Sequence, residues 1–243
     1  MAKKLAKLEK VVVDPSSVPA YVPLPDTNPK TTAATDGDLS CLVLLPGEPV
    51  RIRERLDDVP GRELVRLPGV TVPLAIHAAR RSALLASGSS EFLTDAIVEV
   101  SLDGGDPRTL WSGGPCRPWE VRAAYSERGV LLSHGGALLH LDQEGNERAR
   151  LEWPRSHRIS SDASPGPGRW VIADGRILVS VANGKLLAAA IRDWDVVLCG
   201  RGTMPVDGEL TTDGHDVFVS SDSSLGKVRW MRLDTLHEVC AEA

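Results

Sequence analysis

Aromatic side chains are scarce in this sequence. Its 243 residues include two Tyr, two Phe and six Trp, so aromatic residues make up 4% of the chain. Trp and Arg are the side chains that most often anchor protein interfaces. Any binding surface must therefore rely on the tryptophans, on arginine and on backbone groups.

A long apolar run and an excess of positive charge are also missing. The longest uncharged apolar stretch, 186–191, is far too short to cross a bilayer. The decapeptide MAKKLAKLEK has the lysines of a signal peptide without the apolar segment that should follow them. The net charge of −5 argues against nucleic-acid binding, which usually needs a strongly basic face. We therefore expect a cytoplasmic protein with no membrane insertion and no nucleic-acid partner.

The four cysteines, Cys41, Cys116, Cys199 and Cys240, are far apart. No pair has the short spacing of a zinc knuckle or a redox dithiol. Reduced thiols in a cytosolic protein are the preferred interpretation, and two disulfides in a secreted protein are the alternative. The abundance of Ala, Arg, Val and Leu indicates a GC-rich bacterial genome.

Motifs that carry chemistry are absent as well. Gly226–Lys227 lacks the flanking residues of a phosphate-binding loop, and no GxSxG nucleophile elbow occurs. His134 and His140 flank a Gly-Gly turn, but no third metal ligand accompanies them, so we expect hydroxyl or backbone partners for both. If they lie on a strand, His237 and Cys240 point to opposite faces because their spacing is odd. The sequence predicts no catalytic residue, no cofactor and no metal site.

What is present is a uniform series of short β-rich runs separated by Gly, Asp-Gly and Pro. From Ala96 to Leu102 apolar and polar residues alternate, which is the period of a half-buried strand. Helical periodicity is confined to the N-terminal decapeptide. These features predict an all-β fold.

Five segments of the chain also align with one another. Three clear copies begin at Thr35, Ala173 and Thr212, and two weaker copies begin at Arg80 and Ser126. Their spacing is near forty to fifty residues, the length of a four-stranded propeller blade. The matching turn positions are Gly37, Arg81, Gly129, Gly175 and Gly214. The strands expected before these turns are Lys30–Thr35, Leu74–Ala79, Glu120–Tyr125, Arg169–Asp174 and Gly208–Asp213.

The predicted fold is a β-propeller of about five four-stranded blades. One blade cannot bury both of its faces, so neighbouring blades must stack around an axis. A β-sandwich, or a chain that supplies part of a larger ring, is the structural alternative.

The repeats resemble quinoprotein-like and TolB-type propeller blades, in which an Asp-Gly turn, a strand, a Gly turn and a strand ending in Leu-Asp follow one another. The matching residues are Asp213–Gly214 with Leu233–Asp234, and Leu102–Asp103 with Gly104–Gly105. The Trp-Asp dipeptide of WD40-like repeats occurs once, at 194–195, outside the position it has in those repeats. The resemblance implies the fold and no activity.

Residues 1–29 are expected to form a basic, Pro-rich N-terminal arm, and residues 30–243 the propeller domain. Prolines at positions 15, 19, 23, 25 and 29 forbid a helix. The preferred interpretation adds Val11–Val13 as a strand to an exposed blade edge. The arm could instead add this strand to another protein, or stay disordered with Lys3 to Lys10 near an anionic surface.

A loop rim on one side of the propeller is the predicted binding surface. The loops between blades and the central loops within blades share this rim and carry most of the candidate residues. A second candidate is a basic stripe on one strand, for which a solvated strand face is the preferred interpretation and a dock for an acidic partner the alternative. The candidates are Arg117, Trp119, Arg155, His157, Arg158 and Arg201 on the rim, and Arg51, Arg53 and Arg55 in the stripe.

The sequence therefore favours a non-enzymatic interaction module, a scaffold or regulatory subunit that binds another protein through its loop rim and arm. One alternative is a glycosidase- or lyase-type propeller enzyme with carboxylates in the central channel. The carboxylate candidates are Glu120, Asp207, Glu209 and Asp213. The other alternative is a small-ligand sensor.

Overall fold

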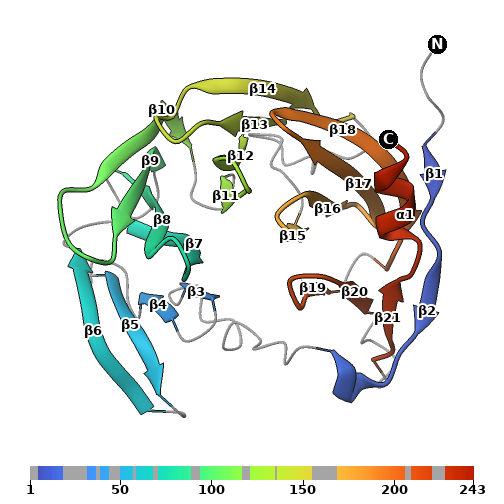
Figure 1. The fold of residues 1–243 in the computed structure, drawn as a ribbon, viewed down its shortest axis with the longest axis horizontal. Helices are drawn as coiled ribbons and strands as arrows, with labels where there is room; N and C mark the ends of the chain where they lie inside the picture. Colours follow the sequence, from blue (N-terminus) through green and yellow to red (C-terminus); the bar gives the residue numbers. More distant parts are fainter. Residues whose placement is uncertain are drawn as a thin grey trace.

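The computed structural model describes residues 5–18, 32–36, 39–43, 50–56, 59–67, 71–88, 94–116, 121–134, 136–154, 169–205, 209–220 and 228–243. Between residues 32 and 73 it describes the backbone alone. Five β-sheets stand around a central axis, which is the arrangement of a propeller (Figure 1). The predicted all-β propeller with about five four-stranded blades is confirmed.

We number the blades in chain order. Blade 1 contains β3 (Thr32–Asp36), β4 (Leu39–Val43), β5 (Val50–Leu56) and β6 (Val59–Leu67). Blade 2 contains β7 (Thr71–His77), β8 (Ser82–Ser87), β9 (Thr94–Ser101) and β10 (Arg108–Cys116). Blade 3 contains β11 (Arg122–Tyr125), β12 (Val130–His134), β13 (Ala137–Leu141) and β14 (Glu147–Glu152). Blade 4 contains β15 (Arg169–Ala173), β16 (Ile177–Ala182), β17 (Lys185–Arg192), β18 (Asp195–Thr203) and β1 (Ala6–Lys7). Blade 5 contains β19 (Leu210–Thr212), β20 (Val217–Ser220), β21 (Trp230–Leu233) and β2 (Lys10–Val12).

The turn positions inferred from the repeats separate the first and second strands of their blades. Arg81, Gly129, Gly175 and Gly214 all lie in such turns, and the five strands expected before the turns are β3, β7, β11, β15 and β19. Gly37 lies outside the described residues. The repeat alignment therefore identified the first strand of every blade correctly. It could do so because a tight turn between two apolar strands depends on residues that are neighbours in the sequence.

The hydrophobic cores lie between neighbouring blades. Leu178 and Val179 are adjacent in β16 and both fully buried, yet Leu178 packs toward blade 3 and Val179 toward blade 5. In blade 3, Leu131 and Leu132 divide in the same way between blades 4 and 2. Successive side chains of a strand point to opposite faces, so each inner strand is apolar on both faces and needs a blade on either side.

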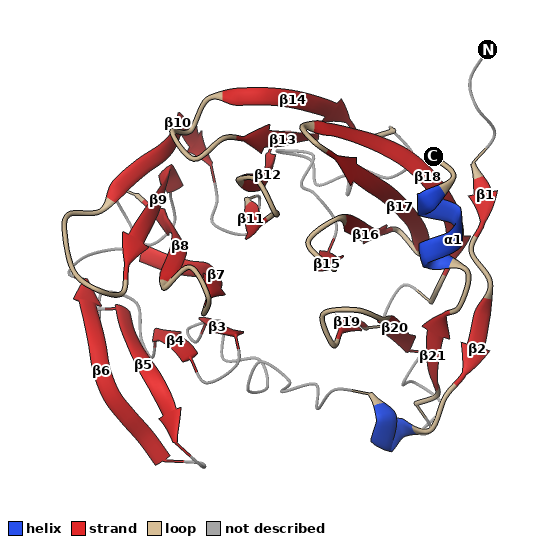
Figure 2. Cartoon of the chain, in the orientation of Figure 1, coloured by secondary structure: helices blue, strands red, loops and turns tan. Residues whose placement is uncertain are grey.

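The N-terminal arm runs along the outer edges of blades 4 and 5 (Figures 1 and 2). β1 pairs in parallel with β18, β2 pairs antiparallel with β21, and the N–H of Val13 donates to the carbonyl of Trp230 at 3.1 Å. A short 3-10 helix, η1 (Pro15–Ser17), follows. The interpretation that Val11–Val13 adds to a blade edge is confirmed. The helical periodicity of the decapeptide does not produce a helix in its described residues, which form β1 and the start of β2. The domain boundary at residues 29 and 30 stays a prediction.

The chain ends in one short helix that the sequence did not predict, α1 (Leu236–Ala241), which lies against blade 4. Cys240 on α1 forms a disulfide with Cys199 on β18, across a Cα–Cα distance of 5.4 Å. The prediction of reduced thiols is therefore wrong for this pair, while the buried thiol of Cys116 donates to the carbonyl of Thr94 at 3.5 Å. Reduced cysteines were one argument for a cytoplasmic location, and the disulfide removes that argument. The cytoplasmic location stays a prediction. Within the described ranges, every helix is too short or too polar to cross a membrane.

Candidate functional site

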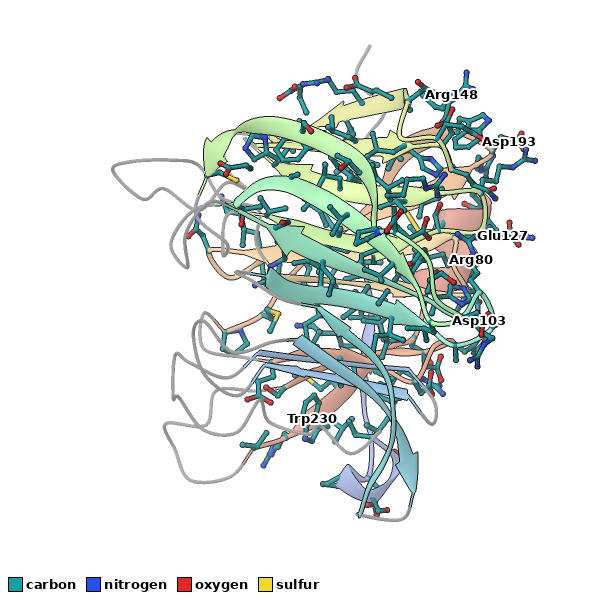
Figure 3. All side chains as sticks on the ribbon, turned by 90° about the vertical axis from the view of Figure 1, so that its left-hand side faces the viewer. Arg80, Asp103, Glu127, Arg148, Asp193 and Trp230 are labelled. Atoms are coloured by element: carbon teal, nitrogen blue, oxygen red, sulfur yellow. A yellow bond between two sulfur atoms is a disulfide. The ribbon has the colours of Figure 1, made fainter. Side chains whose placement is uncertain are left out.

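The turns between the first and second strands of blades 2 to 5 form one face of the propeller. We call residues 78–81, 126–129, 174–176 and 213–216 the turn face. Figure 3 shows Arg80, Asp103, Glu127, Arg148 and Asp193 along this side of the ring, where strands of several blades end. Charged and polar side chains from separate blades therefore meet here.

Arg80 links blade 2 to blade 3. Its guanidinium donates to the backbone carbonyls of Ser126 and Glu127 at 2.6 and 2.7 Å, and lies over the ring of Tyr125 at 5.3 Å. Burial raises the pKa of the Tyr125 phenol far above its usual range, so this ring stays neutral. The arginine thus supplies hydrogen-bond donors to two backbone carbonyls of the neighbouring turn.

Two ion pairs join blade 3 to blade 4. Arg176 contacts Glu127 at 2.6 Å, and Arg128 contacts Asp193 at 2.6 Å. The hydrogen bond from Arg176 lowers the pKa of the Glu127 carboxyl. All four side chains are more than half exposed, so each pair adds little stability, and their main effect is to fix how the turns lie.

The fully buried His140 makes a second connection between blades 3 and 4. Its Nε2 lies 2.8 Å from the Ser126 hydroxyl, and its Nδ1 lies 2.9 Å from the carbonyl oxygen of Trp194. A carbonyl only accepts, so Nδ1 carries the proton and Nε2 accepts from Ser126. Burial lowers the pKa of His140 and keeps the ring neutral. The expected hydroxyl and backbone partners are confirmed for His140, and both ring nitrogens are used.

We expect His140→Gln to lower the free energy of unfolding by about 3 kcal/mol at pH 7.5, because it breaks a buried two-bond bridge. The difference should shrink as the pH falls below about 6.5, where unfolded His140 gains a proton that the buried ring resists. Urea unfolding of both proteins between pH 7.5 and 5.5 measures this. His134→Gln is the control, since His134 is partly exposed, and a pH-independent difference would contradict the buried neutral ring.

Between blades 4 and 5, Asp174 meets two histidines. The Nδ1 of His215 lies 3.0 Å from both carboxylate oxygens of Asp174, and the Nδ1 of His237 on α1 lies 3.6 Å from one of them. The hydrogen bond to Asp174, and then its negative charge, raise the pKa of His215. These three residues have the donor atoms of a metal site.

Two pairs of possible metal ligands were considered from the sequence, His134 with His140 and His237 with Cys240. Neither pair forms a metal site of its own. The ring of His134 lies tilted against that of Trp111, with centroids 4.9 Å apart, while His140 is engaged with Ser126 and Trp194. His237 and Cys240 lie on a helix and not on a strand, so the argument from odd spacing was wrong. His237 reaches the turn face through its own helix, which short-range spacing could not show.

The predicted binding residues are only partly placed. Arg201 belongs to β18 beside β1, paired with Lys7, and does not lie in a rim loop; its side chain is exposed. β5 carries the stripe and lies between β4 and β6, so it is an inner strand of blade 1. The side chains of Arg51, Arg53 and Arg55, and the residues Arg117, Trp119, Arg155, His157 and Arg158, lie outside the description.

Two of the four carboxylates proposed for a channel enzyme, Glu209 and Asp213, lie among the described residues. Asp213 lies on the turn face, where its carboxylate accepts from the N–H groups of His215 and Asp216. Glu209 begins blade 5 and pairs through its backbone with Ser220. Glu120 and Asp207 lie outside the described residues. Asp213 therefore stabilises its own turn.

Comparison with known proteins identifies the fold alone. No family model and no curated protein matches the sequence. Among solved structures, the chain is similar to the WD40 β-propeller domain of Doa1, at 11% identity and a TM-score of 0.55, covering 83% of this chain and 62% of that one. The AfRom2 CNH domain matches at 13% identity and a TM-score of 0.51, covering 84% and 63%. A putative 6-phosphogluconolactonase from Bacteroides fragilis matches at 11% identity and a TM-score of 0.51, covering 82% and 64%.

The chain thus spans less than two thirds of the length of these three matched proteins. Such low identities support a shared fold and no shared activity. By its repeats, its sheets and these similarities, the chain is a β-propeller that resembles TolB-type and quinoprotein-like blades.

Proposed function

We propose that this protein is a non-enzymatic interaction module that binds a partner protein at the outer edge of blade 5, where its N-terminal arm forms the last strand. The observation that carries the proposal is the exposure of apolar side chains at this edge. Val11 and Val12 on β2 are 45% and 66% exposed, and Val228, two residues before β21, is 43% exposed. Among the described residues, these are three of the four large apolar side chains that stand exposed.

The position of β2 supports binding by strand addition. β2 is the terminal strand of its sheet, so among the described strands its outer edge has no partner. Val11 and Val12 point to opposite faces and are both exposed, so neither face of β2 is well covered. An extended apolar segment of a partner would pair with the backbone of β2 and cover these valines.

The turn face supports a scaffold more than an enzyme. Arg80, Glu127 and Arg176 all contact groups of a neighbouring blade, so these side chains hold the ring together. The matched propellers include both a WD40 domain and a putative lactonase, so fold alone favours neither class. The rim candidates from Arg117 to Arg201 stay predictions within this proposal.

We expect Val12→Glu to weaken partner binding at least tenfold, because a charge would be buried against an apolar segment. Tagged full-length protein is purified from its native host, and proteins that co-purify in stoichiometric amounts are identified by mass spectrometry. Deleting the arm is a poor test, since Leu8 is 2% exposed within the core of blades 4 and 5.

Val197→Glu is the matched control, because Val197 is an exposed valine on β18 of blade 4, away from β2. A partner kept by this control and lost with Val12→Glu supports the proposed edge. A partner retained equally by both variants would place binding elsewhere. A monomer without any partner that turns over a sugar or ester substrate would overturn the proposed function.

A further inference from the structure

We propose that Asp174, His215 and His237 form a binding site for a divalent transition-metal ion of the zinc class, which joins blade 4, blade 5 and α1. The inference is independent of the proposed partner binding. It rests on three ligand groups from three separate segments, whose donor atoms all lie within 4.8 Å of one another.

The distances between the donor atoms suit a metal. The Nδ1 atoms of His215 and His237 lie 3.0 and 3.6 Å from carboxylate oxygens of Asp174. Ligands about 2.0 Å from a tetrahedral zinc ion are roughly 3.3 Å apart. An ion therefore needs only small side-chain movements to contact all three groups.

A hydrogen bond fixes the tautomer of His237. Its Nε2 lies 3.1 Å from the backbone carbonyl oxygen of His215. A carbonyl only accepts, so Nε2 carries the proton, and the Nδ1 that faces Asp174 has a free lone pair when the ring is neutral. Such a bond on the far nitrogen is the usual way in which proteins orient a metal-binding histidine.

The backbone holds the two turns of the cluster together. Asp174 adopts φ +50°, a conformation that Asp tolerates better than most residues, and its N–H donates to the carbonyl of Gly214 at 2.6 Å. The N–H of His215 donates to Asp213 at 2.8 Å. The Asp174 and His215 side chains are therefore presented from turns that are fixed to each other.

Helix α1 is equally well held, although it is short. Leu236 is fully buried, Cys240 is bonded to Cys199, and Arg192 donates to the carbonyl of Ala241 at 2.5 Å. His237 follows Leu236 directly, so its position relative to the two turns is set by these contacts.

A simple ion pair between His215 and Asp174 does not explain the third member of the cluster. The rings of His215 and His237 stack at 4.4 Å and 17°, and both direct Nδ1 at one carboxylate. An ion pair needs one imidazole, whereas a metal accounts for both. Two imidazoles and one carboxylate favour zinc and related ions over Ca²⁺ and Mg²⁺, which prefer oxygen. His215 is 67% exposed, so water has access to a fourth position.

The test is zinc binding by full-length protein that has been freed of metal with a chelator. Calorimetry should give one equivalent of bound Zn²⁺, Co²⁺ should give the visible absorption of an imidazole-ligated ion, and Zn²⁺ should raise the Tm. His215→Asn, His237→Asn and Asp174→Asn should each weaken binding by at least 10–100-fold, the loss typical of removing even an outer-shell partner. Asn at position 174 also tolerates the positive φ.

His134→Asn is the matched control, since it removes a histidine elsewhere and should bind zinc like the unchanged protein. Circular dichroism confirms that each variant is folded, which the exposure of His215 makes the expected result. Failure of the unchanged protein to bind Zn²⁺ at up to millimolar concentration would overturn the proposal. Undiminished binding by the folded His215→Asn and His237→Asn variants would also overturn it, because the ion would then lie elsewhere.

Discussion

Gly129→Ala should lower the free energy of unfolding by about 4 kcal/mol or more, which puts it among the most damaging single changes. A Cβ at residue 129 would overlap the backbone carbonyl of Leu141 and crowd the Cα of Asp142. Both neighbours are backbone atoms of a blade interior in which Leu141 is 1% exposed, so no side-chain rotation relieves the overlap. Urea unfolding followed by circular dichroism measures the loss.

Gly175→Ala is the matched control, because Gly175 occupies the same turn in blade 4. Its φ is +63°, and an added Cβ would lie 3.6 Å from the nitrogen of Glu127, an ordinary contact. The cost should be about 1 kcal/mol, from the left-handed conformation alone. Equal losses in the two variants would contradict the argument that the close approach of backbone requires the glycine at position 129.

The same turns explain how much of the fold the sequence could predict. A Gly or Asp-Gly turn between two apolar strands recurs in blades 3, 4 and 5, and in blade 2 Arg81 takes this position with a positive φ. Such a turn depends on neighbours in sequence alone. The number of blades and the first strand of each blade could be predicted from this recurring turn. The helical periodicity of MAKKLAKLEK is not realised, because β1 and β2 pair with strands about two hundred residues away and this pairing overrides a weak local pattern.

The connections between blades were missed, although the sequence held a signal for them. Cys199 and Cys240 are 41 residues apart, and so are Asp174 and His215. That separation is about one blade: Asp174 and His215 lie in equivalent turns of blades 4 and 5, while Cys240 lies on α1, which follows β21. Pairs of chemically matched residues at the repeat length therefore predict contacts, where the short spacings used for metal and thiol motifs do not.

Reduction of the Cys199–Cys240 disulfide should lower the free energy of unfolding by about 4 kcal/mol, the chain-entropy value for a loop of 41 residues. The loop runs from β18 through β19, β20 and β21 to α1, so the bond ties most of blade 5 to blade 4. Urea unfolding with and without a phosphine reductant measures the change. Hydrogen exchange should show the loss of protection first in blade 5.

The double variant Cys199→Ser/Cys240→Ser separates the bond from other effects of the reductant. It should unfold at the lower urea concentration of the reduced protein, and the reductant should then change nothing, although the buried thiol of Cys116 is still present. A urea midpoint that is the same for oxidised and reduced protein would mean that Leu8, Leu236 and the pairing of β2 with β21 hold blade 5 without the bond. A lowered midpoint means that α1 fastens blade 5 covalently to blade 4.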